Sequence, residues 1–155
     1  MTPQEDAALV STFYIGNALF GIDTLNVQEV ISLGAMTPVH HAPDYIAGIM
    51  NLRGQIVTIV DLAKKTEMET ERESLNRHII IVNWRGEYVG LLVDEMGEVF
   101  PADLDNLAPS PANIGQAQNR FLKGVFPAGS RLAAVFDINS VLDEEEDEIT
   151  RPGSG

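Results

Sequence analysis

The sequence predicts a mainly β protein, a barrel or sandwich, built as two similar lobes of about five strands each. Short segments rich in β-branched and aromatic residues, divided by glycine-containing turns, run through most of the chain. Helical segments are few and short, and two of the three begin with an aspartate suited to capping. The order of these features in the first half recurs in the second half, which indicates an internal duplication.

The strand segments are bounded by turn residues. Residues 9–15 alternate and end at Gly16-Asn17, after which strand character resumes, so these segments predict a hairpin. A bend near Asp23-Thr24 leads into the next strand, and Arg85-Gly86-Glu87 is the turn of a later hairpin. The predicted strands cover residues 9–15, 19–22, 27–33, 55–60, 78–84, 88–93, 99–104 and 131–136.

Three short helices are expected between these strands. Residues 43–47 begin with a proline, which suits the first turn of a helix. Residues 61–65 and 137–142 each follow a strand and begin with an aspartate that can cap the helix. The polar segment 66–76 and the proline-containing segment 108–119 are expected to be loops.

The duplication rests on two spacings that occur once in each half. A glycine precedes a Glu-Val pair by eight positions, and another glycine precedes an aspartate by thirteen. These spacings run from Gly21 to Glu29, Gly48 to Asp61, Gly90 to Glu98 and Gly124 to Asp137. A hairpin glycine precedes the first spacing in both halves, so the period of about 70 to 76 residues predicts two related lobes, each ending in a capped helix.

Composition narrows the classes of function. The 155 residues contain no cysteine, which excludes disulfides and thiolate chemistry and fits a cytoplasmic setting. A formal net charge of −13 argues against nucleic acid and against direct membrane contact, because both need a basic face. No apolar run approaches the ~20 residues of a membrane span, and no signal peptide is expected.

The two ends of the chain are expected to lie outside the folded domain. Residues 1–7 are predicted to be a flexible N-terminus, and residues 8–142 to be the domain with its two barrel subdomains. Residues 143–155 begin with six consecutive acidic residues, so they are predicted to be an acidic, disordered tail.

Five motifs in this order resemble the CheW domain family over about residues 8–142. Residues 12–23 resemble its first hairpin, and Leu25-Asn26-Val27-Gln28-Glu29-Val30 resembles its L-x-V-Q-E-I stretch. Residues 48–62, with Asn51-Leu52-Arg53-Gly54 at their centre, resemble its most diagnostic segment, although Thr58 stands where proline is usual. Residues 89–94 and 121–124 are similar to two later motifs.

The resemblance implies two intertwined five-stranded SH3-like barrels around a shared core. It implies a non-catalytic adaptor without a cofactor, which couples chemoreceptors to a chemotaxis histidine kinase. The implied partners are the regulatory domain of the kinase CheA and the cytoplasmic tip of chemoreceptors, so the implied location is the cytoplasm at membrane-bound receptor arrays. A regulatory domain excised from CheA, or from a protein of the CheV type, is the alternative.

The expected receptor-binding residues are Val27, Glu29, Val30, Ile31, Arg53 and Val99. Arg53 has a planar fork of donors suited to a carboxylate, and the resemblance pairs it with Glu29. The four apolar residues are either ordinary core or the lining of a groove for an amphipathic receptor helix. Alternation along a strand means that if Val30 faces inward, Ile31 faces outward beside Arg53.

The expected kinase-binding residues are Gly48, Met96 and Gly124. The two glycines are expected to permit close backbone packing at helix–strand corners, near the barrel ends that the resemblance associates with partner contacts. Met96 is expected to be an adaptable apolar filler of the core.

Two further classes of function are weighed against the adaptor. A small hydrolase or lyase would need paired carboxylates, for which the candidates are Asp23, Asp61, Asp94 and Asp137. A barrel that binds a small molecule would need a sizeable apolar cavity. No metal site is expected, because His40 and His41 are adjacent on an extended chain and have no third ligand nearby in the sequence.

Overall fold

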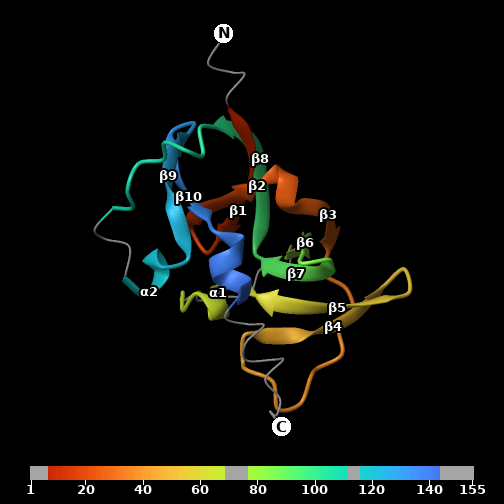
Figure 1. The fold of residues 1–155 in the computed structure, drawn as a ribbon. Helices are drawn as coiled ribbons and strands as arrows, with labels where there is room; N and C mark the ends of the chain where they lie inside the picture. Colours follow the sequence, from red (N-terminus) through yellow and green to blue (C-terminus); the bar gives the residue numbers. More distant parts are fainter. Residues whose placement is uncertain (1–6, 69–76, 112–115, 144–155) are drawn as a thin grey trace.

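The computed structural model describes residues 7–68, 77–111 and 116–143, which form two five-stranded sheets. The first sheet has the order β8 (Glu95–Ala102), β1 (Ala8–Ile15), β2 (Ala18–Asp23), β10 (Arg131–Phe136) and β9 (Leu122–Ala128). The second has the order β3 (Val27–Ser32), β6 (His78–Trp84), β7 (Glu87–Val93), β5 (Gln55–Asp61) and β4 (Ile46–Leu52). The sheets form one SH3-like barrel each and lie against one another (Figure 1).

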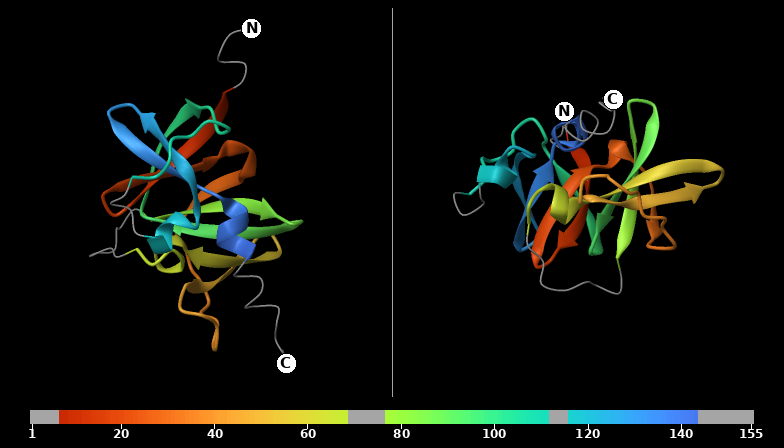
Figure 2. Two further views of the ribbon diagram at one scale, coloured as in Figure 1. Left: turned by 60° about the vertical axis from the view of Figure 1, so that its left-hand side comes forward. Right: turned by 90° about the horizontal axis from the view of Figure 1, so that it is seen from below.

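The two barrels exchange a hairpin. The first barrel takes β1 and β2 from the N-terminal half of the chain and its other three strands from the C-terminal half. The second barrel takes β6 and β7 from the C-terminal half and its other three strands from the N-terminal half. Figure 2 shows how the red and blue ends of the chain meet in one barrel, while the yellow and green segments meet in the other. The predicted duplication and intertwining are therefore confirmed.

Matching registers relate the two halves. Thr12 pairs with Gly21 in the first barrel, and Ile81 pairs with Gly90 in the second. The parallel pairing of β10 with β2 is repeated by β5 with β7. Each sheet is open between its end strands, where one isolated bridge continues it, Thr37 to Ile49 in one barrel and Ala108 to Val125 in the other.

Buried side chains form three clusters, one inside each barrel and one between them. Val57, Ile59, Ile79, Ile81 and Leu92 fill the second barrel. Val10, Leu19, Phe126, Ala133 and Val135 belong to the cluster of the first. The largest cluster lies between the sheets and includes a stack of the rings of Phe13, Phe20 and Phe136. Strands that are apolar on both faces therefore join the two barrels into one body.

Two strands, β4 and β9, were not predicted. Each contains a glycine at a φ outside the usual range, 158° for Gly48 and 152° for Gly124, which weakens the strand signal. A Cβ on Gly48 would lie 2.8 Å from the carbonyl oxygen of Thr37, and one on Gly124 would lie 2.6 Å from that of Ala108. The close backbone packing expected at these two glycines is confirmed. Their expected position at helix–strand corners is wrong, because both lie within strands.

We expect Gly124→Ala to lower the free energy of unfolding by about 2–3 kcal/mol, because a backbone carbonyl cannot move aside cheaply. Its Cβ would also meet the Cβ of Leu107 at 2.7 Å. Urea denaturation measures the change. Gly34→Ala is the matched control, since no atom of the described part of the chain lies within 4 Å of a Cβ at that position. Equal midpoints for the two variants would contradict the packing argument.

The helices are as short as predicted, with two corrections. Asp61 caps α1 (Leu62–Lys65) by accepting from the backbone N–H of Lys64 at 3.3 Å. Residues 138–143 are helical, and the carboxylate of Asp137 accepts from the N–H of Asn139 at 3.1 Å. Residues 43–47 are not a helix, because Pro43 begins a turn that leads directly into β4. The predicted loop 108–119 contains the short helix α2 (Gln116–Asn119).

The remaining predictions on loops and termini fall largely outside the described residues. These are most of the loop 66–76, most of the N-terminal segment 1–7 and the tail from residue 144 onward. Asp143, which the sequence assigned to the tail, is the last described residue of the C-terminal helix and pairs with Arg85 at 2.8 Å. None of the helices in the described part of the chain is long and apolar enough to cross a lipid bilayer.

Candidate functional site

Arg53 lies at the tip of the hairpin that joins β4 to β5. Leu52 pairs with Gln55, so Arg53 and Gly54 form a two-residue turn with φ of 51° and 88°. Such a turn needs a positive φ at both positions, and the side chain of Asn51 supports it by accepting from the N–H of Gly54 at 2.9 Å. Strands lie on both sides of Arg53, although a helix over residues 43–47 was expected on its N-terminal side.

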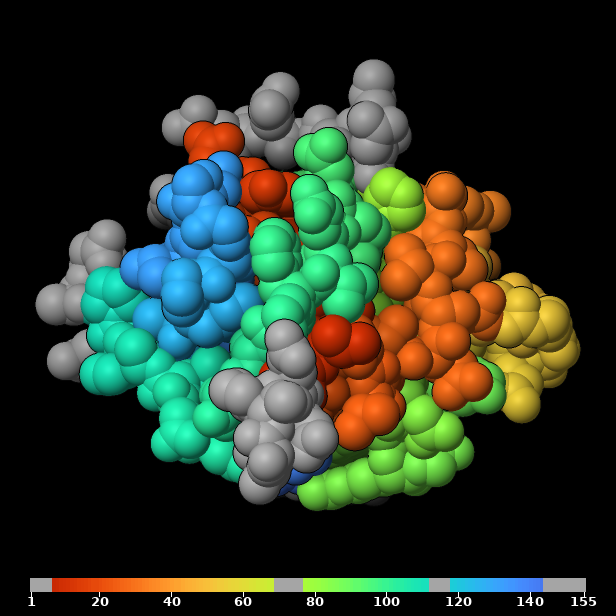
Figure 3. Space-filling view, turned by 90° about the horizontal axis from the view of Figure 1, so that it is seen from above, coloured from red at the N-terminus to blue at the C-terminus, as the bar shows by residue number. Residues whose placement is uncertain are grey.

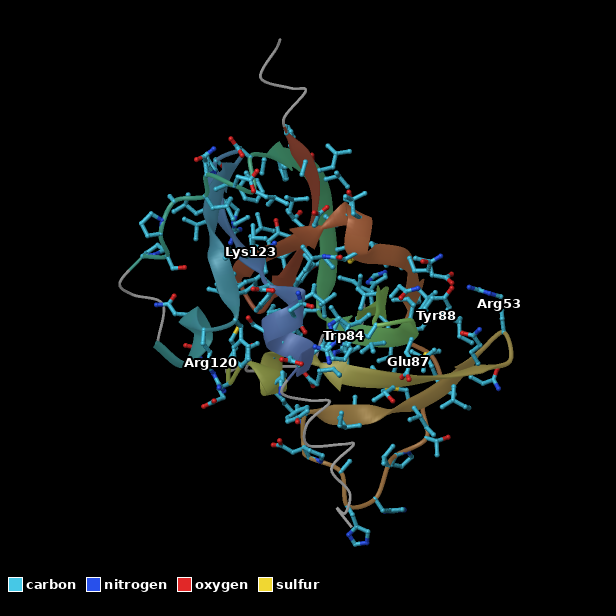
Figure 4. The ribbon with its side chains drawn as sticks, viewed as in Figure 1. Arg53, Trp84, Glu87, Tyr88, Arg120 and Lys123 are labelled. Atoms are coloured by element: carbon cyan, nitrogen blue, oxygen red, sulfur yellow. The ribbon has the colours of Figure 1, made fainter. Side chains whose placement is uncertain are left out.

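The guanidinium of Arg53 forms an ion pair and a hydrogen bond with the carboxylate of Glu29 on β3. The pairing expected from the resemblance is therefore present. The hydrogen bond that Arg53 donates to Glu29, and next the negative charge of Glu29, raise the pKa of Arg53 above its ordinary value. The side chain of Arg53 is 67% exposed and that of Glu29 is 29% exposed, so the pair is open to a partner. Figure 4 shows Arg53 projecting from one side of the molecule, with Tyr88 next to it toward the centre.

The apolar residues of β3 alternate as predicted, and it is Val30 that faces outward. Val30 is 40% exposed, whereas Ile31 is half-buried and packs against the cluster inside the second barrel. Val27 is half-buried and packs against the shared core. Val30, and not Ile31, is therefore the β-branched residue that faces outward near the Arg53–Glu29 pair.

Val99 on β8 is also exposed, by 53%, so the core alternative is wrong for Val99 as it is for Val30. Leu9 and Leu25, for which the sequence predicted no role in binding, are exposed by 53% and 88%. Leu9 pairs with Pro101 and Ser11 with Val99, which places Leu9 and Val99 near one another on adjacent strands. Leu25 could have been assigned to the binding surface from the sequence, because it is the first residue of the motif Leu25–Val30 that resembles the family's L-x-V-Q-E-I stretch.

β3 and β8 contribute equivalent residues to the two barrels. Sixty-nine positions separate Val27 from Met96, Glu29 from Glu98, Val30 from Val99, and Ile31 from Phe100. Val27 and Met96 both pack against the shared core, while Ile31 and Phe100 pack inside their own barrels. Seen from above, the green segment with β8 and the orange segment with β3 lie on one face, with part of the red first strand visible between them (Figure 3).

The three residues assigned to kinase binding do not form one patch. Gly48 lies in β4 of the second barrel and Gly124 in β9 of the first, and both are buried. Met96 is half-buried against the shared core, as its expected role as a filler requires. Any influence of these residues on a partner is therefore exerted through the shape of the strands that contain them.

The aspartates considered for catalysis have structural partners. Asp23 accepts from the N–H of Leu25, and Asp61 and Asp137 cap helices. Asp94 accepts from the N–H of Gly16 at 2.6 Å. Asp61 and Asp94 do come together, but on either side of Arg77, whose guanidinium nitrogens lie 3.3 Å and 3.9 Å from their carboxylates. This cluster links elements of both barrels.

The structure also contains an open pocket of about 540 Å³ beside the first barrel. Phe20, Met68, Val125 and Leu132 are among the residues that line it. It lies at the surface rather than inside a barrel, where the side chains of Ile59, Ile79 and Ile81 are completely buried. The described residues contain no group of three or more His, Cys, Asp or Glu side chains placed to hold a metal ion.

An exposed ion pair beside protruding apolar side chains, held on a rigid pair of barrels, is typical of a protein-binding module. Residues 10–146 match the family model for the CheW-like domain, so the chain belongs to the CheW-like domain family. As a member of this family it is a non-catalytic scaffold of bacterial chemotaxis, and the prediction that it is not an enzyme is confirmed by the family.

Individual relatives agree with this assignment. The chain is 33% identical over 134 residues to the chemotaxis protein CheW of Klebsiella aerogenes, covering 86% of this chain and 81% of that protein. It is 27% identical to the protein FrzA of Myxococcus xanthus, covering 82% and 79% of the two chains. The crystal structure of the scaffolding protein TtCheW from Thermoanaerobacter tengcongensis matches with a TM-score of 0.78 and 28% identity, covering 88% and 93% of the two chains.

Proposed function

We propose that this chain couples chemoreceptors to the histidine kinase CheA in the cytoplasm. In this role one surface binds the cytoplasmic tip of a receptor, and another binds the regulatory domain of the kinase. The observation that carries the proposal is the exposed Arg53–Glu29 pair beside Val30, because charged and apolar groups are there offered together without another element of the described chain covering them.

The proposed receptor surface consists of Val27, Glu29, Val30, Ile31, Arg53 and Val99, joined by Leu9 and Leu25. The exposed members, Val30, Val99, Leu9 and Leu25, supply the apolar contacts. The half-buried Val27 and Ile31 fix the strand from which Val30 projects. This combination suits an amphipathic helix, whose apolar face needs protruding aliphatic groups and whose polar flank needs charged ones.

The proposed kinase surfaces are the barrel ends shaped by Gly48, Met96 and Gly124. The glycines hold β4 and β9 close to Thr37 and Ala108, and so set the outline of each barrel. Because no side chain projects from either glycine, their substitution is expected to affect kinase binding only through the position of the strand.

Reconstitution tests the coupling role. The purified chain, a soluble receptor fragment containing the cytoplasmic tip, and CheA are mixed in pairs and together, and the complexes are separated by size-exclusion chromatography. Coupling predicts both pairwise complexes and a ternary complex in which the kinase elutes with the receptor only when the chain is present. A chain that binds one partner only is not a coupling protein.

We expect Arg53→Ala to weaken receptor binding by about tenfold while changing the thermal midpoint by only a few degrees. Arg53 is highly exposed, so its loss costs little packing, but an arginine at an interface contributes strongly when it is desolvated. Calorimetric titration with the receptor fragment measures the affinity, and circular dichroism measures the midpoint.

Arg120→Ala is the control for this prediction. Arg120 is another exposed, ion-paired arginine, 52% exposed and 3.8 Å from Glu67, and it lies at the opposite end of the molecule (Figure 4). We expect it to leave receptor binding unchanged. If Arg53→Ala unfolds the protein, Arg53 is a structural residue and its assignment to the receptor surface is wrong.

A further inference from the structure

The two barrels differ at the position that corresponds to Arg53. The hairpins β4–β5 and β9–β10 have equivalent turns, because Leu52 pairs with Gln55 and Ala128 pairs with Arg131. Arg53 is the first residue of one turn, with φ 51°, and Gly129 is the first residue of the other, with φ 65°. The second barrel therefore supplies an arginine at this position, whereas the first barrel supplies none.

The carboxylate that corresponds to Glu29 is nevertheless retained. Glu98 on β8 is the equivalent of Glu29 on β3, and it is exposed. The backbone carbonyl of Glu98 accepts from the hydroxyl of Thr12, which fixes the strand at this point. Among the residues that the structure describes, no lysine or arginine forms an ion pair with the side chain of Glu98, whereas Arg53 neutralises Glu29.

The space that an arginine would occupy in the first barrel is open. Over the described residues, a Cβ built on Gly129 meets nothing closer than the ring of Phe100, at 4.0 Å. Phe100 is half-buried and lies two residues after Glu98 on the same strand. An acceptor carboxylate next to an aromatic ring suits a guanidinium better than an ammonium, because the planar group can hydrogen-bond at its edge and stack on its face.

Two exposed apolar residues lie near Glu98 on β8 and on the adjacent strand. Val99 follows it directly, and Leu9 lies on the adjacent strand beside Val99. A ligand for this place therefore needs an apolar surface with a single positive charge at its border. The amphipathic receptor helix of the proposed function has this chemistry when an arginine flanks its apolar face.

We propose that Glu98 is the docking point for an arginine of the receptor helix, which takes in trans the place that Arg53 takes in cis in the other barrel. This inference rests on the proposed function and assigns one residue of the receptor surface. It implies that the two barrels recognise the partner differently, although their folds are equivalent, because one barrel presents a completed ion pair and the other presents a free acceptor.

Calorimetric titration of the full chain with the receptor fragment tests this assignment. Glu98→Gln is expected to weaken binding by about three- to tenfold and to make the affinity less dependent on salt, since one intermolecular charge pair is lost. Gly129→Arg is expected to weaken binding similarly, because it builds the ion pair of the other barrel and blocks Glu98. Gly129→Gln has the same backbone strain without the charge, and it is expected to bind like the wild type.

The outcomes separate this inference from the proposed function. If the wild-type chain binds the receptor fragment and Glu98→Gln binds it equally tightly, the role of Glu98 is overturned and the proposed function stands. If the wild-type chain does not bind the fragment at all, the proposed function fails and the inference fails with it. If Gly129→Arg does not fold, as circular dichroism would show, Glu98→Gln alone decides.

Discussion

Ile59→Asp is expected to unfold the protein at room temperature. Ile59 is completely buried in β5, among the aliphatic side chains that fill the second barrel. Its Cδ1 atom lies 2.5 Å from the Cβ position of Gly90, so it occupies the space that this glycine leaves open. An aspartate there would lose these contacts and bury a carboxylate without a partner, which costs at least about 4 kcal/mol, a large part of the stability of a domain of this size.

Far-ultraviolet circular dichroism and a urea titration measure this effect. Ile56→Asp is the matched control, because it makes the same substitution three residues earlier in the same strand, where the side chain is 63% exposed. We expect that variant to change the free energy of unfolding by no more than about 0.5 kcal/mol, the usual range for surface substitutions. Comparable stability of the two variants would mean that the interior of the second barrel is not closely packed.

Arg77→Ala is expected to lower the free energy of unfolding by about 2–3 kcal/mol. Arg77 lies between the carboxylates of Asp61 and Asp94, and all three side chains are at most 16% exposed. Asp61 caps α1 beside the second barrel, and Asp94 holds the turn of the β1–β2 hairpin of the first barrel through Gly16. Removal of the arginine leaves two shielded carboxylates without their common cation, so the contact between the barrels is expected to weaken first.

Arg85→Ala is the control for Arg77→Ala. The pair of Arg85 with Asp143 is about half exposed on both sides, and exposed ion pairs contribute at most about 1 kcal/mol. Thermal and urea denaturation of the two variants should therefore differ clearly. A loss for Arg77→Ala no greater than that for Arg85→Ala would show that the cluster is solvent-screened. A broadened transition for Arg77→Ala alone would indicate that the barrels unfold separately.

Much of the fold could be predicted from the sequence, because local patterns determine it. The turns at Gly16-Asn17 and Arg85-Gly86 were predicted from residues that tolerate a positive φ, and β6 and β10 have the predicted bounds. Asp61 and Asp137 were expected to cap helices and do so, since a cap acts within three residues of itself. The duplication was visible because equal spacings between such local signals survive in both halves.

The strands β4 and β9 could not be predicted in this way. Gly48 and Gly124 weaken the local preference for a strand, and Pro43 at a suitable position suggested a helix instead. The backbone is extended there because each segment pairs with the next strand of its sheet and with one residue of the preceding loop. Tertiary hydrogen bonds therefore overrode the local preference.

In the candidate site, too, some features could be predicted from the sequence and others depended on tertiary contacts. The pairing of Arg53 with Glu29 was expected from the family resemblance, and the structure contains it. The direction of Val30 and Ile31 was not determined by the sequence, because both are β-branched apolar residues and either fits the core. Only the position of β3 at the edge of its sheet, with one face against the barrel interior, decided that Ile31 faces inward and Val30 outward.

The sequence by itself determined two related lobes of short strands, their hairpin turns, their capped helices and membership of a family of chemotaxis scaffolds. The tertiary structure alone decided which half of the chain completes which barrel, that Arg77 joins Asp61 to Asp94, and that Val30 faces outward while Ile31 faces inward. The difference arises because some interactions join neighbours in the sequence and others join residues that are far apart in it. Turns and caps depend on neighbours in the sequence, whereas strand exchange and ion pairs depend on residues brought together only when the shared core excludes water.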